Sequence, residues 1–416
     1  MNLNFENLPL LKEGIEERYG TILAPYAITK PKENSRDYDY LEEVRNNENR
    51  SDFQRDRDRI IHSKAFRRLM YKTQVFVNHE GDHYRTRLTH TLEVSQFARG
   101  ICKSLALNED LAEAIALGHD LGHTPFGHAV ERYINNYLSR KKLGEFHHNE
   151  QSVRVVDFIE TRTHMYRGLN LTSEVREGIL KHNDRYSNIY ENLSPGKPCS
   201  SLEGQTVNLV DTIAYICHDL QDGIKSGLIE KAIMTNSDFS IGFNEISNII
   251  EDIIGEKINF SPYHDTYFID KLIHEFIMSI TFQSASNIKQ HNITSVEDVF
   301  SLSNKNVTII ELDNDKKALF KRLKKLIRDN VYKLYTIKTM DFKAVSVVRD
   351  LLNSFIKDPT LLPPEEYCKY CNMEIDPNYK GAVNSQIRVI CDYISCMTDR
   401  FALEEHERIK NPRIKI

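Results

Sequence analysis

Hydrophobic residues recur three and four positions apart along most of this chain, the spacing of one face of an α-helix. The pattern is clearest over residues 88–107, 110–117, 129–138, 172–181 and 207–222, and it continues beyond residue 230. A short apolar run at 75–77, followed by a polar loop at 78–82, predicts one short β-hairpin within this helical pattern. The pattern therefore predicts an all-α fold.

The same pattern divides the chain into three stretches. Residues 1–50 mix charged residues with Pro25 and Pro31 and show little periodicity beyond a short helix near 11–19, so we expect an arm that wraps the body. Residues 51–230 combine strong helical spacing with most of the clustered histidines and are expected to form the core. Residues 231–416 are expected to form a C-terminal helical region that packs on this core and takes part in oligomer contacts.

Polar residues concentrate in one stretch, residues 118–131, which contain three His, one Asp and one Glu. His119 and Asp120 are adjacent in the last turn of a helix that is expected to stop at Gly122, so an imidazole nitrogen and a carboxylate oxygen can face one ion. Such a mixed set suits Mn, Fe, Mg or Zn. His128 and Glu131 then lie three positions apart on the next helix, so their side chains are on the same face of it.

Two further polar residues stand on apolar helices. His90 is in line with Val94 and Phe97, where a single histidine is often only a satisfied core residue. Asp211 begins a polar stripe on a helix that is otherwise apolar, and Tyr215, Asp219 and Asp222 continue the stripe. A buried carboxylate is costly without a partner, so either an ion or a buried arginine should face Asp211.

The composition is that of an ordinary globular protein. The chain has 416 residues, of which 40% are hydrophobic and 28% charged, and its net charge of -5 gives no overall attraction to nucleic acid. One basic helix is expected at residues 316–328, with a solvated face as its simpler interpretation and a site for phosphate or a nucleic-acid strand as the alternative.

Compartment signals point to the cytoplasm. The chain has no export signal and no run of about 18 apolar residues, so we expect a cytoplasmic protein without a membrane segment. Its seven cysteines, an odd number, are expected to be reduced thiols rather than a disulfide framework.

His90, His119–Asp120 and Asp211 resemble the H…HD…D signature of the HD-domain metal phosphohydrolases. Further segments resemble the bacterial deoxyguanosine triphosphate triphosphohydrolase branch of that superfamily: RDRIIH at 57–62, FRRL at 66–69, YKTQVF at 71–76, RLTH at 87–90, HNEQS at 148–152 and MTDRFA at 397–402. The resemblance is strong over residues 35–230 and looser over 340–405.

The resemblance implies a fold and an activity. The fold would be an HD-domain helical core at residues 51–230 in a homo-oligomer, a tetramer or a hexamer. The activity would be hydrolysis of deoxynucleoside triphosphates at the α-phosphate, which gives the deoxynucleoside and intact inorganic triphosphate. The cofactor would be one divalent metal ion per site: Mn, Mg or Fe, with Zn as the alternative. An allosteric deoxynucleoside triphosphate and single-stranded DNA are further partners that the resemblance leaves open.

The resemblance also implies roles for particular residues. The metal ligands would be His90, His119, Asp120 and Asp211, and the catalytic pair would be His128 and Glu131. The residues along the phosphates and metal-bound waters would be Arg87, His123, His148 and Asp219. Gln74, with Val75 beside it, would contact the sugar 3′-hydroxyl, and Tyr215 would pack where a 2′-hydroxyl would lie. Thr212 departs from relatives that carry lysine there, so no phosphate contact is expected from it.

Two other functions fit the same residues. One is another HD-type nucleotide phosphohydrolase, a nucleotidase or a phosphodiesterase, which would release orthophosphate or a nucleoside monophosphate. The other is a regulator that binds nucleotide or single-stranded DNA and uses the HD residues only as structure.

Overall fold

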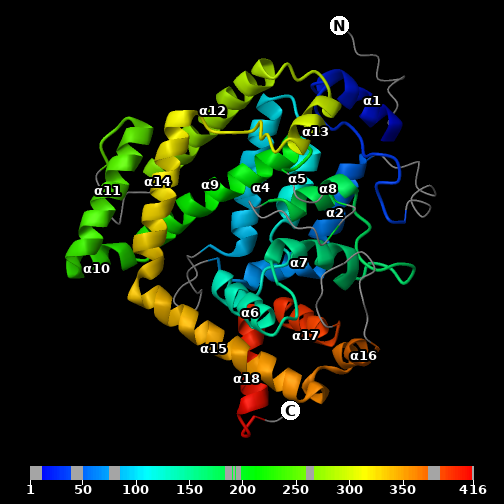
Figure 1. The fold of residues 1–416 in the computed structure, drawn as a ribbon, viewed down its shortest axis with the longest axis vertical. Coiled ribbons are helices and arrows are strands. Elements are labelled where there is room, and N and C mark those ends of the chain that lie inside the picture. Colours follow the sequence, from blue (N-terminus) through cyan, green and yellow to red (C-terminus); the bar gives the residue numbers. More distant parts are fainter. Residues whose placement is uncertain are drawn as a thin grey trace.

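The computed structural model describes residues 12–38, 50–74, 85–182, 190, 193, 198–258, 267–372 and 385–414. All regular elements in these ranges are helices, and the β-type contacts among them are isolated bridges from Thr73 to Thr86 and from Thr161 to Gly168. The all-α prediction is therefore confirmed (Figure 1). The predicted β-hairpin, at residues 75–82, lies outside the described residues. None of the described helices carries an apolar stretch sufficient to cross a lipid bilayer.

Helices α4, α5 and α9 pack against one another at the centre of the molecule (Figure 1). Helix α4 spans Arg87–Ser104, α5 spans Glu109–Gly118 and α9 spans Leu202–Lys225. The side chain of Asn108 caps α5 by accepting hydrogen bonds from the backbone of Asp110 and Leu111. Residues 111–118 of α5 are nearly all small or apolar, so this helix is buried and can form the middle of the core.

Shorter helices surround this centre. They are α2 (Asp52–Ile61), α3 (Lys64–Arg68), the 3₁₀ turn η4 (Leu69–Tyr71), α6 (His128–Arg140), α7 (His148–Arg154), the π-helical turn η6 (Val155–Ile159) and α8 (Ser173–Leu180). Helices α2 and α8 both pack on α5, and α7 packs on α8. The turns between these short helices bring polar residues to the ends of the three central helices.

The C-terminal half packs on this core in two groups of helices. The first group shares the large apolar core of the central helices: α10 (Leu228–Thr235), α11 (Ser237–Ile254), α12 (Tyr267–Gln290), α13 (Val296–Asn304), α14 (Asn314–Asn330) and η8 (Val331–Lys333). The second group forms a separate apolar core with α6: α15 (Tyr335–Lys357), η9 (Pro359–Leu361), α16 (Pro364–Asn372), α17 (Ser385–Ser395) and α18 (Asp399–Lys410). Figure 1 shows this second group at one end of the molecule, in orange and red.

The N-terminal stretch begins with α1 (Lys12–Ile22) and then contacts the core through polar groups. The guanidinium of Arg36 pairs with the buried carboxylate of Asp56 at 2.5 Å. The hydroxyl of Ser35 donates to Glu174 at 2.6 Å, and the backbone N–H of Ile28 donates to Glu203 at 3.1 Å. Residues 28–36 are therefore fixed against α2, α8 and α9.

Helix α14 contains the predicted basic stretch. Its apolar face, with Phe320, Leu323 and Ile327, is buried in the core. Several of its cations pair with carboxylates of neighbouring segments: Lys316 with Glu275, Lys317 with Glu311 and Arg322 with Glu245. This arrangement favours the simpler interpretation of a solvated face.

Candidate metal centre and active site

The four predicted metal ligands lie together where α4, α5 and α9 meet, and we call them the buried cluster: His90, His119, Asp120 and Asp211. Nε2 of His90 lies 2.9 Å from Oδ1 of Asp211. Nε2 of His119 lies 3.4 Å from a carboxylate oxygen of Asp120 and 3.4 Å from one of Asp211. Ligand atoms of the two histidines and Asp120 all lie within 4.8 Å of one another. Helices α4 and α9 and the turn after α5 thus present their polar groups to one point.

The turn after α5 differs from the sequence expectation. Helix α5 ends at Gly118, so His119 and Asp120 lie in the following turn and not in the last turn of the helix. A Cβ atom on Gly122 would lie 2.2 Å from the backbone nitrogen of Ser152 and 2.4 Å from the carbonyl oxygen of His148. Glycine is therefore required because α7 approaches this turn closely, and not because it stops the helix.

Hydrogen bonds behind His90 determine which of its ring nitrogens carries the proton. Burial lowers the pKa of His218 to about 4, so this ring is neutral, and its Nε2 lies 2.5 Å from a carboxylate oxygen of Glu93. In the tautomer of His218 that carries its proton on Nε2, next to Glu93, Nδ1 accepts from Nδ1 of His90 at 3.1 Å. Nε2 of His90 is then unprotonated and faces Asp211 with its lone pair.

The second histidine of the buried cluster is oriented in the same way. Nδ1 of His119 donates to the carbonyl oxygen of Ala116 at 2.6 Å, so its Nε2 is the nitrogen that faces the carboxylates. This Nε2 is buried and has no hydrogen-bond partner among the described residues. In the neutral rings the Nε2 lone pairs of both histidines face carboxylate oxygens, and such acceptors need a cation between them, either a proton or a metal ion. The nitrogen and oxygen donors present therefore fit a divalent metal ion.

Charges around the buried cluster favour its ionised carboxylates. Burial alone would raise the pKa of Asp120, but the positive charges of His119, His123 and Arg87 hold it well below its usual range. Nη1 of Arg87 donates to Asp120 at 2.9 Å, and both side chains are buried. Nε and Nη2 of Arg87 are buried and have no hydrogen-bond partner among the described residues. Arg87 therefore has donors to spare beside the buried cluster, where they suit an anionic ligand.

A second group of side chains lies next to the first, and we call it the loop cluster: His123, His128, Glu131 and His148. Oε2 of Glu131 accepts from Nδ1 of His128 at 2.9 Å, and Oε1 accepts from Nδ1 of His148 at 2.8 Å. The ring of His123 stacks on that of His148, with centroids 4.0 Å apart. Ligand atoms of all four residues lie within 4.8 Å of one another. The expected pair of His128 and Glu131 is thus hydrogen-bonded in the structure.

The proton positions in the loop cluster follow from His182. Burial lowers the pKa of His182 to about 3, and its Nδ1 donates to the carbonyl oxygen of Ile179 at 2.6 Å. Its Nε2 therefore accepts, and Nε2 of His148 lies 2.9 Å away as the donor. His148 makes its hydrogen bonds to His182 and Glu131 together only when both of its nitrogens carry protons. Glu131 thus receives three N–H groups, from the ring of His128 and from the ring and the backbone of His148, and Nε2 of His128 remains outside this network.

The two clusters adjoin through two contacts. Nε2 of His123 lies 3.1 Å from Oδ1 of Asp120, which connects the loop cluster to the buried cluster directly. The ring of His182 lies edge-on to His119, with centroids 5.2 Å apart, and also contacts His148. The two clusters therefore form one continuous site.

The C-terminal helices hold the loop that carries these residues. The carboxylate of Asp399, at the start of α18, accepts from the backbone N–H of Phe126 at 2.8 Å and of Thr73 at 2.9 Å. Nζ of the buried Lys72 donates to the carbonyl oxygens of His123 and Ser395. The segment MTDRFA at 397–402 thus fixes the turn between α5 and α6, although it lies far from it in the sequence.

The structure describes Gln74, Tyr215 and Asp219, three of the residues that are expected to contact the substrate. Tyr215 is half-buried on α9, and Nζ of Lys324 lies 5.5 Å from the centre of its ring. Asp219 is buried and accepts a hydrogen bond from the hydroxyl of Tyr332, and burial raises the pKa of Asp219 to about 8. Oε1 of Gln74 is buried and has no partner among the described residues. Val75 lies outside the described residues.

Sequence reasoning missed the residues behind the two clusters. Glu93 lies three positions after His90 on α4, and His218 lies seven positions after Asp211 on α9, so helical spacing could have found both. His182 and Tyr332 give no such signal, because tertiary packing alone brings them to the site. Tyr332, for example, is 113 residues from Asp219.

Comparison with known families agrees with this geometry. Residues 87–225 match the HD domain, and residues 310–408 match the phosphohydrolase-associated domain. The first match contains the whole buried cluster, and the second contains Asp399. The fold, the ligand set and these matches define the class as HD-domain hydrolases with a metal-binding site.

The relatives narrow this class. The chain is 41% identical over 408 residues to a deoxyguanosinetriphosphate triphosphohydrolase-like protein of Geobacter metallireducens. This alignment covers 97% of this chain and 99% of the relative. Proteins with the same name from Rickettsia bellii and Bordetella pertussis are 41% identical over 373 residues and 42% identical over 377 residues. These two alignments cover 86% and 87% of this chain, and 92% and 90% of the relatives. The chain therefore belongs to the family of deoxyguanosinetriphosphate triphosphohydrolase-like proteins, and the resemblance seen in the sequence is confirmed.

Proposed function

We propose that this protein hydrolyses deoxynucleoside triphosphates at the α-phosphate and releases the deoxynucleoside and inorganic triphosphate. The proposal rests on the observation that the buried cluster and the loop cluster adjoin. A set of donors that fits one divalent ion adjoins a histidine–glutamate pair, and a buried arginine with spare donors lies beside them. A polyanionic substrate calls for these parts and not for a covalent nucleophile.

In this proposal the buried cluster binds the metal, and Arg87 binds phosphate oxygens. A bound Mn, Mg or Fe ion would neutralise negative charge on the substrate and polarise the α-phosphoryl oxygen. The spare N–H groups of Arg87 would donate hydrogen bonds to phosphate oxygens while its Nη1 still donates to Asp120. His123 and His148 lie beside the proposed phosphate site and would exclude water molecules other than the attacking one.

The loop cluster supplies the proton chemistry of the proposed reaction. Water forms a bond to the α-phosphorus, the bond from that phosphorus to O5′ breaks, and O5′ gains a proton. Nδ1 of His128 is held by Glu131, so its Nε2 is the atom that exchanges a proton with the reactants. In one version Nε2 takes a proton from the attacking water, and in the other it gives a proton to O5′. The side chain of His128 is 53% exposed, so a substrate can reach it.

The sugar contacts complete the proposed substrate site. Gln74, with its unpartnered Oε1, and Val75 would lie against the sugar 3′-hydroxyl. Tyr215 would pack where a 2′-hydroxyl would lie, which would select deoxyribose by steric exclusion. Asp219 would contribute from the same face of α9, with Tyr332 holding its carboxylate in place.

The products test this proposal. Each of the four deoxynucleoside triphosphates would be incubated with the protein and Mn, and the products separated by anion-exchange chromatography. We expect one inorganic triphosphate for every deoxynucleoside released. Orthophosphate or a nucleoside monophosphate would instead identify another HD-type phosphohydrolase. Binding of nucleotide or single-stranded DNA without turnover, whichever metal is supplied, would favour a regulator.

A further inference from the structure

The edge where α17 meets α18 contacts every segment that carries a histidine of the loop cluster. We call residues 392–399 the C-terminal edge: Asp392 and Ser395 lie at the end of α17, and Asp399 begins α18. The side chains of all three residues are buried. Figure 1 shows α17 and α18, in red, beside α6, and the apolar residues of these helices share the second core. The C-terminal edge thus brings polar groups of the second core to the loop cluster.

Asp399 holds the turn that leads into His128. Phe126 and Gly127 both have a positive φ, +59° and +67°, and this conformation is strained at Phe126 because it carries a Cβ atom. Helix α6 starts at the next residue, His128, and has no side-chain cap of its own. The backbone N–H of Phe126 donates to Oδ1 of Asp399 at 2.8 Å. A carboxylate of the C-terminal edge therefore stabilises a strained turn directly before His128.

Lys72 connects the C-terminal edge to His123. Its side chain is only 1% exposed, and its Nζ donates to the carbonyl oxygens of His123 and Ser395. The next residue, Thr73, donates its backbone N–H to Oδ2 of Asp399 at 2.9 Å. Burial lowers the pKa of Lys72 to about 8, so the ammonium is the main form at neutral pH and can donate to both carbonyl groups. One buried cation thus fixes the backbone of His123 to that of Ser395.

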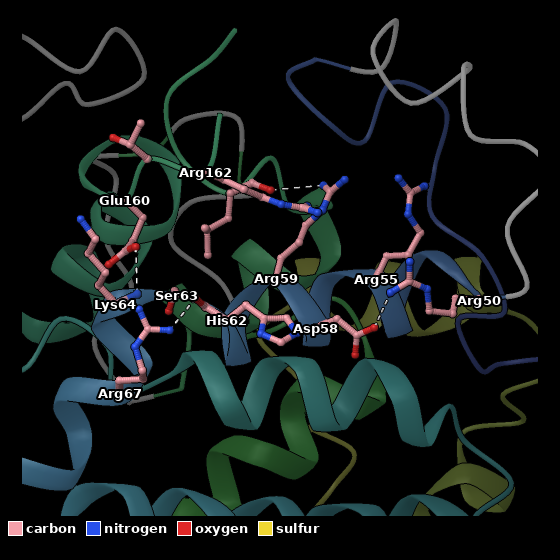
Figure 2. Close-up of a pocket in the computed structure, with 12 residues that line it drawn as sticks. Arg50, Arg55, Asp58, Arg59, His62, Ser63, Lys64, Arg67, Glu160 and Arg162 are labelled. Atoms are coloured by element: carbon pink, nitrogen blue, oxygen red, sulfur yellow. Dashed lines mark hydrogen bonds and ion pairs between the residues drawn. The ribbon is translucent and has the colours of Figure 1, made fainter. Parts of the chain in front are cut away.

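The segment that leads to Thr73 is also held at its other end. Glu160 accepts hydrogen bonds from the backbone N–H groups of Lys64 at 3.1 Å and Ala65 at 2.8 Å, at the start of α3, and Figure 2 shows its carboxylate directed at that helix end. The chain runs from there through α3 and η4 to Thr73. Loss of the contact between Thr73 and the C-terminal edge therefore frees only one end of this segment, the end next to Gln74.

Asp392 holds helix α7, whose first residue is His148. Oδ1 of Asp392 accepts from Nε2 of Gln151 and from Nε of Arg154, both at 3.0 Å. Oδ2 accepts from Nε of Arg154 at 2.8 Å, and Nε2 of Gln151 also donates to Oγ of Ser395 at 2.9 Å. All four of these side chains are buried, so the contacts are shielded from water. The C-terminal edge therefore fixes α7, and with it the position of His148.

The buried cluster has a different support. Hydrogen bonds and ion pairs of its side chains join it to α4, to α9 and to residues 116–123. Among the described residues, none of these side-chain contacts joins it to the C-terminal edge. A change at the C-terminal edge should therefore disturb the loop cluster and leave the proposed metal ligands in place.

We propose that Asp399 and Asp392 are positioning residues, which hold the loop cluster at the geometry that proton transfer requires. Asp399 acts on His128 through the turn at Phe126, and Asp392 acts on His148 through α7. This proposal rests on the proposed function, because it assumes that His128 exchanges a proton with the reactants. Proton transfer requires heavy atoms about 2.6–3.2 Å apart, so a displacement of about 1 Å is sufficient to slow it.

The main test is Asp399→Asn, which preserves the size of the side chain but offers one acceptor oxygen to two backbone N–H groups. We expect turnover at saturating metal and substrate to fall about 10- to 100-fold, while the metal content stays unchanged. The matched control, Asp238→Asn, also replaces a carboxylate in the first turn of a helix, but this carboxylate is exposed on α11. The control should leave turnover and metal content unchanged. Loss of metal in Asp399→Asn equal to its loss of turnover would overturn the proposal.

A double-mutant cycle with His128→Ala separates positioning from a general loss of stability. If Asp399 acts through His128, Asp399→Asn lowers turnover less than about threefold once His128 is absent. A carboxylate that serves only the stability of the fold would lower turnover by the same factor with and without His128. That result would overturn the proposal.

Hydrogen–deuterium exchange tests the same contacts without relying on turnover. Mass spectrometry of peptides should show faster exchange at residues 123–131 in Asp399→Asn and at residues 148–154 in Asp392→Asn. Peptides from α4 and α9 should exchange as in the unaltered protein. Unchanged exchange at both segments would overturn the proposal, as would equally faster exchange along the whole chain. If the unaltered protein releases no inorganic triphosphate, the proposed function fails, and the exchange rates still decide whether the two carboxylates hold these segments.

Discussion

The buried cluster and the loop cluster adjoin, yet they are built in opposite ways. The buried cluster takes its side chains from α4, from α9 and from the turn after α5, and the side chains of its two histidines are at most 1% exposed. The loop cluster comes from residues 123–148, a single stretch of chain, and its His128 is 53% exposed. A metal ion needs ligands that are fixed and shielded, whereas a residue that exchanges protons with a substrate needs access. The difference in construction therefore fits the proposed division between ion binding and proton transfer.

The largest expected effect comes from the buried cluster. Asp211→Ala removes a carboxylate that faces both histidines, so we expect loss of the bound metal and a fall in turnover of at least about 1000-fold. Metal content by atomic emission and turnover measured on the same sample test this together. A variant that keeps its full metal content would show that Asp211 is not a ligand.

The loop cluster should respond differently. His128→Ala removes the proposed proton donor or acceptor but no proposed ligand, so we expect turnover to fall about 100- to 1000-fold while the metal content stays unchanged. His164→Ala, which alters an exposed histidine away from both clusters, is the matched control and should leave both quantities unchanged. Equal metal loss in His128→Ala and Asp211→Ala would contradict the proposed division between metal binding and proton transfer.

A smaller effect is expected from the residue behind the buried cluster. His218→Ala removes the acceptor that places the proton of His90 on Nδ1, so we expect metal affinity to fall about 10- to 100-fold. Because His218 is not a proposed ligand, turnover should recover when the metal concentration is raised. Turnover that stays low at saturating metal would assign His218 a role beyond positioning His90.

The smallest expected effect is a dependence of metal affinity on pH. Burial would lower the pKa of His119, but the carboxylates of Asp120 and Asp211 outweigh it and raise this pKa to about 9. A proton on His119 competes with a metal ion, so affinity should rise with pH by at most about tenfold per unit below that pKa and level off above it. Titration of the metal at several pH values measures this slope. An affinity that falls as pH rises would contradict ligation by His119.

The sequence was sufficient to predict what depends on helical spacing and on short motifs. The all-α fold follows from the apolar periodicity, and the proposed ligand set follows from the family resemblance of His90, His119–Asp120 and Asp211. The structure brings these four residues together. The pair of His128 and Glu131 also follows from spacing, because both residues lie in one turn of α6.

What could not be predicted depends on contacts between distant segments. Gly122 looked like a helix stop, but its role is set by the backbone of α7, which no local pattern reveals. Asp399 was noticed only as part of a motif, and its hydrogen bonds to Phe126 and Thr73 appear only in the fold.

The central claim is attack of water at the α-phosphorus, and oxygen-18 labelling tests it most directly. A deoxynucleoside triphosphate would be hydrolysed in H₂¹⁸O, and the masses of both products would be measured by mass spectrometry. The account predicts one labelled oxygen in the inorganic triphosphate and none in the deoxynucleoside. Label in the 5′-hydroxyl of the deoxynucleoside, or in released orthophosphate, would contradict it.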